Sequence, residues 1–505
     1  MPSDASLPLQ ILGAGPARSP WQLPAPYPST LLALWPGVKP PGIEVVLEAL
    51  LETTPGVEIL GELPATPGTL WLFAVALPAP AECRAIIFAE PSDALPDVSA
   101  GEADSGAPRP RFTVGIEFVA ARERVLATFG FAMAALRRIV PETSAILDVA
   151  ASTWHHRAGL DRWFGGAGPT EAETARGAVG ARPPSSDRAA AALDPPEWLL
   201  WSTHAVTRSR EPAPDEPAWV RTSGLWRCGL PELEILEVPA AHLRAAVALV
   251  NGIAGLLLEG GPPDPLRRWR VGHGLEVVLA PWRTLAAALD PERPGSFATR
   301  GLEDVPAATE SLAHPFGGIR AAICDPEPRG LYRPRWSWPQ GAIEALERGD
   351  GALDQPELAA QRTRRAAQRT LDVLRAAVEP RRGDEIAPRV DAPEAPGAPR
   401  GRPEERRGPT RALLEIAVGL APDASAAIEH AWLEVDRCVG DAFECRVLDD
   451  AILAGALTAG ARRRVEPSEV TDWQVRIDGT TAGPDDAPEL AEILESRRRR
   501  VEEPA

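Results

Sequence analysis

Three stretches of the sequence contain almost no large apolar side chains, and they interrupt the segments that are able to build a hydrophobic core. They are residues 91–111, 165–196 and 379–410. The last stretch is the strongest, because Pro, Arg and Glu alternate through it and such a composition cannot bury enough apolar surface to fold. We therefore expect a disordered linker at 379–410 and long surface loops at the other two stretches.

With 505 residues the chain is too long for one ordinary hydrophobic core, so two or three domains are expected. The breaks predict an irregular proline-rich arm at 1–30, a body at 31–378 and a small module at 411–505. The body itself divides at the second break into two subdomains, 31–164 and 197–378.

Within the body, dense apolar runs of strand length are mixed with segments of helical periodicity. The runs that predict strands are 69–77, 83–89, 112–119, 145–150, 198–206, 219–225, 233–238, 266–279 and 318–324. The segments that predict helices are 42–51, 121–140, 241–258, 341–347 and 355–378. Closely spaced strands with few crossover helices favour antiparallel pairing. The expected fold class is therefore α+β, with mainly antiparallel sheets and helices packed on them.

The last hundred residues show apolar and polar residues in alternation over several short segments. The apolar members are Leu433, Val435, Phe443, Cys445, Val447, Trp473, Val475 and Ile477. A period of two predicts a small antiparallel sheet with one buried face, and closure into an SH3-like barrel would explain how so few residues bury a core. A helical tail with arginines at 497–500 follows this β-rich module.

The balance of charge bears on location and partners. The formal net charge is −18, and a field of this sign repels phosphate backbones, so nucleic-acid binding is disfavoured. The longest apolar stretch, 245–258, is too short to cross a bilayer, and residues 1–4 lack the basic start of a secretory signal. We expect a cytoplasmic protein with no membrane contact.

The helix expected at 355–378 carries basic side chains around an apolar stripe. They are Arg362, Arg364, Arg365, Arg369 and Arg375. A helix that binds a partner or a nucleic acid is one interpretation. A solvated basic face above an intramolecular contact is the commoner one, and we prefer it.

Five cysteines lie at positions 83, 228, 324, 438 and 445, and none forms a Cys-x-x-Cys pair. Scattered cysteines in a cytoplasmic chain are usually buried thiols. Cys438 and Cys445 flank an expected hairpin turn and could form a disulfide there, but the reduced state is favoured.

Few residues of the sequence are candidates for catalysis or for metal binding. The sequence holds no nucleophile elbow, phosphate-binding loop or zinc-binding helix motif. His155 and His156 follow an expected strand, but neighbouring residues point apart and no third ligand is evident, so no metal or other cofactor is expected. Glu232 and Glu234 share a strand face and could do acid–base work, or they could simply lie on a solvated outer face.

Fifteen tryptophans against two tyrosines is an unusual ratio. Trp432 and Trp473, with Asp472 beside the second, could line a groove for a ligand or a peptide. Core packing is the alternative, and for most tryptophans it is the safer one.

The C-terminal module resembles the bacterial family known as domain of unknown function 2314 over about residues 411–483. The resemblance rests on His430, Trp432, Gly440, Gly460 and the run Val470-Thr471-Asp472-Trp473. It implies no catalytic residue.

A second resemblance lies upstream. The segment Gly224–Glu234 resembles domain of unknown function 4026, and the related family 4261 has a similar stretch; Ala145–Trp154 also fits this group. Members of the group carry a histidine just before the Gly-Leu pair, where this chain has Ser223. A role for that histidine therefore does not carry over.

Taken together, the sequence favours a non-catalytic cytoplasmic protein that binds a protein partner through its C-terminal module. The alternative is a hydrolase-type enzyme with a carboxylate and histidine site in the body. A pocket that brings His155 or His156 to Glu232 and Glu234 would favour the enzyme.

Overall fold

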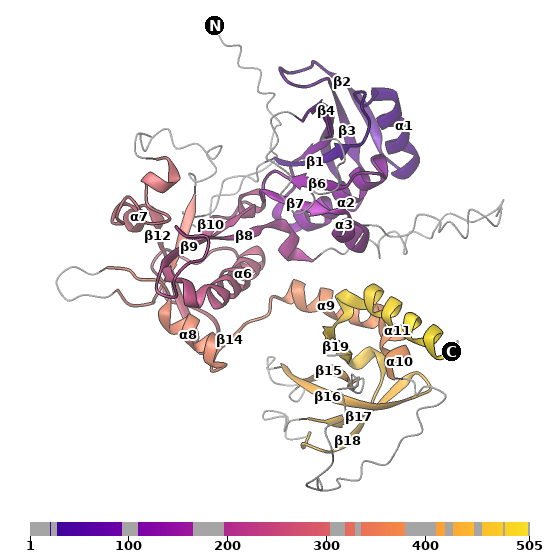
Figure 1. Cartoon of the computed structure of the whole chain (residues 1–505), viewed down its shortest axis with the longest axis vertical. Helices are drawn as coiled ribbons and strands as arrows, with labels where there is room; N and C mark the ends of the chain where they lie inside the picture. Colours follow the sequence, from indigo (N-terminus) through magenta and orange to yellow (C-terminus); the bar gives the residue numbers. More distant parts are fainter. Residues whose placement is uncertain are drawn as a thin grey trace, which may run out of the picture. The chain divides into compact units, whose positions relative to one another are not determined.

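The computed structural model divides into two compact units, Met1–Pro356 and Glu357–Ala505, which are described separately (Figure 1). It describes residues 21, 28–92, 110–164, 196–302, 319–328, 335–378, 411–419, 428–448, 457–477 and 480–502. The expected linker lies outside these residues, and so do most of the expected arm and most of the two expected surface loops. The division at residue 356 differs from the expected end of the body at 378, because the helices that follow 356 pack on the second unit.

The first unit contains a seven-stranded antiparallel sheet in the order β2-β3-β4-β5-β1-β6-β7. Its strands are β1 (Ser29–Trp35), β2 (Glu58–Leu63), β3 (Trp71–Leu77), β4 (Cys83–Pro91), β5 (Phe112–Phe118), β6 (Ala145–Asp148) and β7 (Thr153–His156). Its helices are α1 (Ile43–Thr53), α2 (Val125–Ile139) and α3 (Arg157–Phe164). The central helix, α2, buries Phe129, Met133 and Leu136 at helical spacing in the core and ends just before Pro141, whose ring disfavours helix at Val140.

A second seven-stranded sheet in the same unit has the order β14-β11-β12-β13-β10-β9-β8. Its strands are β8 (Ser202–Val206), β9 (Pro217–Ser223), β10 (Glu232–Pro239), β11 (Trp269–His273), β12 (Leu275–Pro281), β13 (Arg320–Cys324) and β14 (Ala352–Leu353). Only β10 and β13 pair in parallel among the described strands. Helices α6 (Leu243–Gly260) and α8 (Gln340–Arg348) lie on one face, and α7 (Trp282–Ala287) lies on the other.

Helix α6 is the one helix in the described part of the chain that is long and apolar enough to cross a membrane. Half of its most apolar window is buried, and it packs against β8, β9 and β10. Asn251, which interrupts its apolar stretch, accepts hydrogen bonds from Trp201 Nε1 at 3.0 Å and Thr203 Oγ1 at 2.7 Å. This pairing is typical of a helix in the core of a folded unit.

The second unit is a six-stranded antiparallel sheet in the order β18-β17-β16-β15-β19-β20. Its strands are β15 (Arg411–Gly419), β16 (Ile428–Val439), β17 (Ala442–Val447), β18 (Arg462–Val465), β19 (Val470–Ile477) and β20 (Thr480–Ala482). Helices α9 (Glu357–Arg369), α10 (Leu371–Val378) and α11 (Ala487–Glu502) cover one face (Figure 1). All eight alternating apolar residues named above are buried, which confirms the expected one-sided sheet. The SH3-like closure is not confirmed, since β18 and β20 are its two edges.

The fold class is therefore α+β with mainly antiparallel sheets, as predicted. The helix expected at 355–378 is two helices, α9 and α10, separated at Thr370. The apolar stripe of both faces the second unit's core through Ala367, Leu371 and Leu374.

Candidate functional site

Glu232 and Glu234 are both buried in β10, with 4% and 0% of their surface exposed. They share the strand face that also carries Leu236 and packs against α7, while Leu233 and Ile235 face α6 on the opposite side. The solvated-face interpretation is therefore wrong, because both sides of this sheet are covered.

Glu234 forms a buried ion pair with Arg300, whose Nη2 lies 2.9 Å from Oε2. Trp219 Nε1 donates a second hydrogen bond to Glu234 at 3.0 Å. The guanidinium of Arg300 lies between the rings of Trp219 and Trp282, 4.4 and 4.5 Å from their centroids. Its Nε donates to Gly295 O at 2.7 Å. Such an arrangement offsets part of the desolvation of both charges.

Glu232 organises the turn that follows β9. Its Oε1 accepts the backbone N–H groups of Gly224 and Trp226 at 2.7 and 3.3 Å, and its Oε2 accepts Thr222 Oγ1 at 2.6 Å. Gly224 has φ +116°, and a Cβ there would lie 2.6 Å from Leu200 O. Only glycine fits this position, and both carboxylate oxygens of Glu232 are used to hold the turn.

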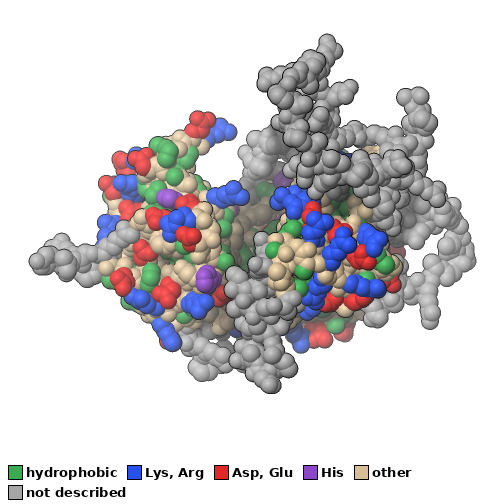
Figure 2. Space-filling view, turned by 90° about the horizontal axis from the view of Figure 1, so that it is seen from below, with side chains coloured by type: hydrophobic (Ala, Val, Ile, Leu, Met, Phe, Trp, Pro, Cys, Tyr) green, Lys and Arg blue, Asp and Glu red, His purple; other side chains and the backbone are tan. Residues whose placement is uncertain are grey.

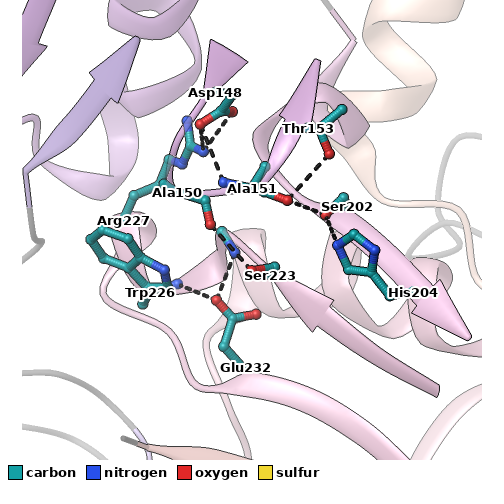
Figure 3. A network of polar contacts seen from close by, with 11 residues as sticks. Asp148, Ala150, Ala151, Thr153, Ser202, His204, Ser223, Trp226, Arg227 and Glu232 are labelled. Atoms are coloured by element: carbon teal, nitrogen blue, oxygen red, sulfur yellow. Dashed lines mark hydrogen bonds and ion pairs between the residues drawn. The ribbon is translucent and has the colours of Figure 1, made fainter. Parts of the chain in front are cut away.

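The same turn carries Arg227 into contact with the first sheet. Arg227 lies in the short 3-10 helix η4 (Leu225–Cys228), and its Nη2 lies 2.5 and 2.6 Å from the two oxygens of Asp148 at the end of β6 (Figure 3). Both side chains are fully buried. The guanidinium also lies 5.2 Å from the ring centroid of Phe129. This ion pair therefore joins the two sheets of the first unit.

His155 lies beside this pair in β7. Burial lowers its pKa below the ordinary value; Asp148 opposes that shift, and Arg227 and His156 add to it. The ring is therefore neutral at physiological pH, and it packs edge-on against Phe129.

The turn after β6 makes further hydrogen bonds across the junction of the two sheets (Figure 3). Across the junction, Ser223 Oγ donates to Ala150 O at 3.3 Å; within the turn itself, Ala151 N donates to Asp148 Oδ1 at 3.2 Å. Ser223 occupies the place where the resemblance leads one to expect histidine, and here it serves this junction.

Ser202 and His204 lie together on β8, with 2.6 Å between Ser202 Oγ and His204 Nε2. The hydroxyl of Ser202 donates to Ala151 O, so His204 Nε2 must carry the proton that joins the pair. Burial lowers the pKa of His204, and Arg221 lowers it further. Among the described residues no carboxylate hydrogen-bonds the other ring nitrogen. This pair was not predicted from the sequence, although the i, i+2 spacing of Ser202 and His204 on a strand was the available signal.

The candidate enzyme site is not assembled as the alternative requires. Neither Glu232 nor Glu234 hydrogen-bonds His155 or His156, because their oxygens are occupied by the partners named above. In the part of the chain that the structure describes, no group of three or more His, Cys, Asp or Glu residues could hold a metal ion.

In the second unit, the two predicted tryptophans lie on opposite faces of the sheet. Trp473 is fully buried, and its Nε1 donates to Thr370 Oγ1 at 3.1 Å, between α9 and α10. Trp432 is half-buried on the face away from the helices. The two rings therefore do not line one groove.

Trp432 belongs to a row of three cross-strand neighbours on this outer face. Its register partner is Glu415 in β15, whose partner in β19 is Asp472. Thr471 Oγ1 donates to Glu415 Oε2 at 3.0 Å, and Trp473 N donates to Asp472 Oδ1 at 2.7 Å. Glu415 was not predicted as a site residue, although its alternation with Leu414 and Ile416 in the sequence places it on this face.

Burial raises the pKa of Asp472 from its ordinary value to about 6. The neighbouring carboxylates Glu415 and Asp485 contribute to this raised value, while the backbone N–H of Trp473 and the guanidinium of Arg362 act in the opposite direction. The outer face thus holds two carboxyl groups that repel each other beside a partly exposed indole.

The cysteines are free thiols in the structure. Cys438 pairs in register with Phe443, and Cys445 pairs with Val435, so the two are not cross-strand partners. Burial raises the pKa of Cys445 to about 12, which makes its thiol unreactive.

The fold and these contacts define an α+β protein whose first unit has a buried polar junction between its two sheets and whose second unit has a sheet face that its described helices do not cover. Residues 203–312 match the model of the family described as "Protein of unknown function (DUF4026) C-terminal". The matched region runs from β8 through α7 and contains Glu232, Glu234, Arg227 and Arg300. No curated protein and no solved structure matches the chain.

Proposed function

We propose that the protein is a non-catalytic binding protein, and that its second unit binds a protein partner through the outer face of its sheet. The observation that carries the proposal is the row Trp432–Glu415–Asp472 on the face that α9, α10 and α11 leave uncovered. The resemblance of this region to domain of unknown function 2314 belongs to the same proposal, as does a cytoplasmic location.

The chemistry of the row suits protein recognition. An indole combines a large apolar surface with one donor, and tryptophans of this kind act as anchors at interfaces. The adjacent carboxyl groups of Glu415 and Asp472 favour a cationic side chain in the partner, because such a charge relieves their mutual repulsion. Arg411 with Glu434, and Arg446 with Asp436, form exposed ion pairs at the rim of this face.

A protein suits the surface better than a nucleic acid does. Figure 2 shows acidic side chains among the basic ones on the face in view. Together with the net charge of −18, this distribution gives little attraction for a phosphate backbone.

The buried glutamates support a non-catalytic role for the first unit. General acid–base work requires a carboxyl group within reach of a substrate, but Glu232 and Glu234 each engage both oxygens inside the protein.

A hydrolase remains a second candidate because of the contact between Ser202 and His204. A serine nucleophile must give its proton to the base, whereas Ser202 gives its proton to a backbone carbonyl. Labelling with a fluorophosphonate probe tests this candidate directly. Covalent labelling of Ser202 that His204→Ala abolishes would favour the hydrolase over the binding protein.

The binding proposal is tested by affinity capture with the full chain and two tryptophan variants, Trp432→Ala and Trp198→Ala. Trp198 is a matched control, since it is an exposed tryptophan of the first unit. We expect a stoichiometric partner that Trp432→Ala loses and Trp198→Ala keeps, followed by reconstitution with the purified partner. Capture that is identical for both variants, or no partner at all, would contradict the proposal.

A further inference from the structure

Strand β2 is held at the outer edge of the first sheet by β3 alone among the described strands (Figure 1). None of its six residues is buried, and Ile59 and Leu60 expose 37% and 44% of their surface. An edge strand offers unpaired backbone donors and acceptors, so it is a template for one more strand.

Exposed aliphatic side chains are concentrated in the segment of the sequence that contains this strand. Of the eleven large hydrophobic residues exposed among the described residues, six lie between positions 38 and 70. They are Val38, Val45, Leu51, Ile59, Leu60 and Leu70. Single exposed apolar residues are ordinary, but their concentration in one short segment is typical of an interaction surface.

The same segment is strongly acidic. Residues 40–70 contain five glutamates and no lysine or arginine. They are Glu44, Glu48 and Glu52 on α1, and Glu58 and Glu62 on β2. All five are exposed, and none forms an ion pair with a described residue. Elsewhere in the first unit, by contrast, several exposed glutamates have arginine partners, such as Glu82 with Arg124 and Glu292 with Arg208.

Two features of β2 also protect a free edge against aggregation. One is its charge, and the other is the irregular register between Ile59 and Gly61. Protection of the edge accounts for the glutamates. It does not account for Ile59 and Leu60, because exposed aliphatic side chains increase the risk of aggregation. An acidic edge with exposed aliphatic residues instead selects for a partner of opposite charge.

We propose that β2, within the segment 38–70, is a docking edge for a partner protein that adds to it a strand with basic and aliphatic residues on both faces. The bulge at Leu60 places Glu58 on one face of the sheet and Glu62, with Ile59, on the other. One basic side chain of the partner therefore pairs with each glutamate, and its aliphatic side chains cover Ile59 and Leu60. A second copy of this chain is the wrong occupant, because it would bring five more glutamates to the same interface and only one basic residue, Lys39.

The test uses the full chain and a fluorescein-labelled nine-residue peptide that repeats Arg-Arg-Val-Val, which puts both residue types on each face of an added strand. Its control is the same peptide with two valines replaced by proline, which cannot donate to a ladder. Binding is followed by fluorescence anisotropy, and its position by hydrogen–deuterium exchange of the amides of 58–63. We expect binding that protects these amides and weakens as salt is added.

Two charge-reversed variants locate the site. Glu58→Lys with Glu62→Lys inverts the charge of β2, and Glu211→Lys with Asp215→Lys makes the same change in net charge on an exposed loop of the same unit. We expect the first to weaken binding about tenfold, as for two exposed ion pairs, and the second to leave it nearly unchanged.

Several results would overturn the proposal. Equal weakening by both variants would mean a general attraction of a basic peptide to an acidic protein. Equal binding of the proline peptide would rule out strand addition, and so would the absence of protection at 58–63 or of any binding. A dimer of the chain that Glu58→Lys with Glu62→Lys dissociates would assign the surface to a second copy.

Discussion

Carboxyl groups lie in contrasting environments in the two units. In the first unit, Asp148 and Glu234 are fully buried, and each has an arginine and a further hydrogen-bond donor. In the second unit, Asp472 is only partly buried, but its register partner is another carboxyl group, Glu415. The buried carboxylates of the first unit therefore have a cationic partner at hydrogen-bond distance. Burial is the main cause of the raised pKa of Asp472, and its neighbouring carboxylates add to it.

The strongest test of this contrast is the ion pair between Arg227 and Asp148. Arg227→Met leaves a buried carboxylate without its cation, so the free energy of unfolding of the first unit should fall by about 3–5 kcal/mol. Urea unfolding followed by tryptophan fluorescence measures it. Arg208→Met is the control: it removes an exposed pair with Glu292 and should cost less than about 1 kcal/mol. Adding Asp148→Leu to Arg227→Met should restore most of the loss, and equal effects of the two arginine variants would refute the contrast.

The turn that carries Arg227 gives the next largest effect. Gly224→Ala puts a Cβ 2.6 Å from Leu200 O at a positive φ, so we expect a loss of about 3 kcal/mol. Gly301 also has a positive φ, but a Cβ added there would meet no atom within 4 Å, so Gly301→Ala should cost only about 1 kcal/mol. Thermal unfolding of both variants checks this difference; similar shifts would mean that the close approach at Gly224 is not important.

The pH dependence of stability tests the environment of Asp472. Its folded pKa of about 6 lies above the ordinary 3.8, so the folded state keeps a proton that the unfolded state releases between these values. Stability of the second unit should therefore fall as pH rises from about 4 to about 6 and stay level above that. Asp472→Asn should be more stable than the wild type by about 1 kcal/mol at neutral pH, after allowance for solvent screening, and equal to it below about pH 4. A variant that is less stable at neutral pH would show that the ionised carboxylate is stabilising.

The exposed glutamates of β2 should give the smallest effect on stability. Glu58→Lys with Glu62→Lys removes no described contact, so the free energy of unfolding should change by less than about 0.5 kcal/mol. Urea unfolding of this variant beside the wild type provides the measurement. A large loss would mean that these side chains stabilise the sheet rather than serve a partner.

Local pattern was enough to predict much of this fold. Alternation around Leu433 and Trp473 predicted the one-sided sheet, and the period of two placed Glu232 and Glu234 on one face of their strand. Strand β2 was missed because none of its residues is buried, so its sequence carries no alternation of apolar and polar residues.

Long-range partners could not be predicted in the same way. Arg300 lies 66 residues from Glu234, and Arg227 lies 79 residues from Asp148. A buried arginine and a solvated one look alike in a sequence, and only the packing of distant segments distinguishes them. The boundary at 356 was missed for a similar reason, since the apolar stripe of α9 and α10 does not reveal which core it joins.

The ion pair between Arg227 and Asp148 limits which substitutions relatives of this protein can carry. The region that matches the family model, 203–312, contains Arg227 but not Asp148. A relative that carried this region without the first sheet would keep a buried guanidinium with no anion, so it would have to replace the arginine or supply another acid. Among relatives, we therefore expect the arginine and the aspartate to be retained together or lost together.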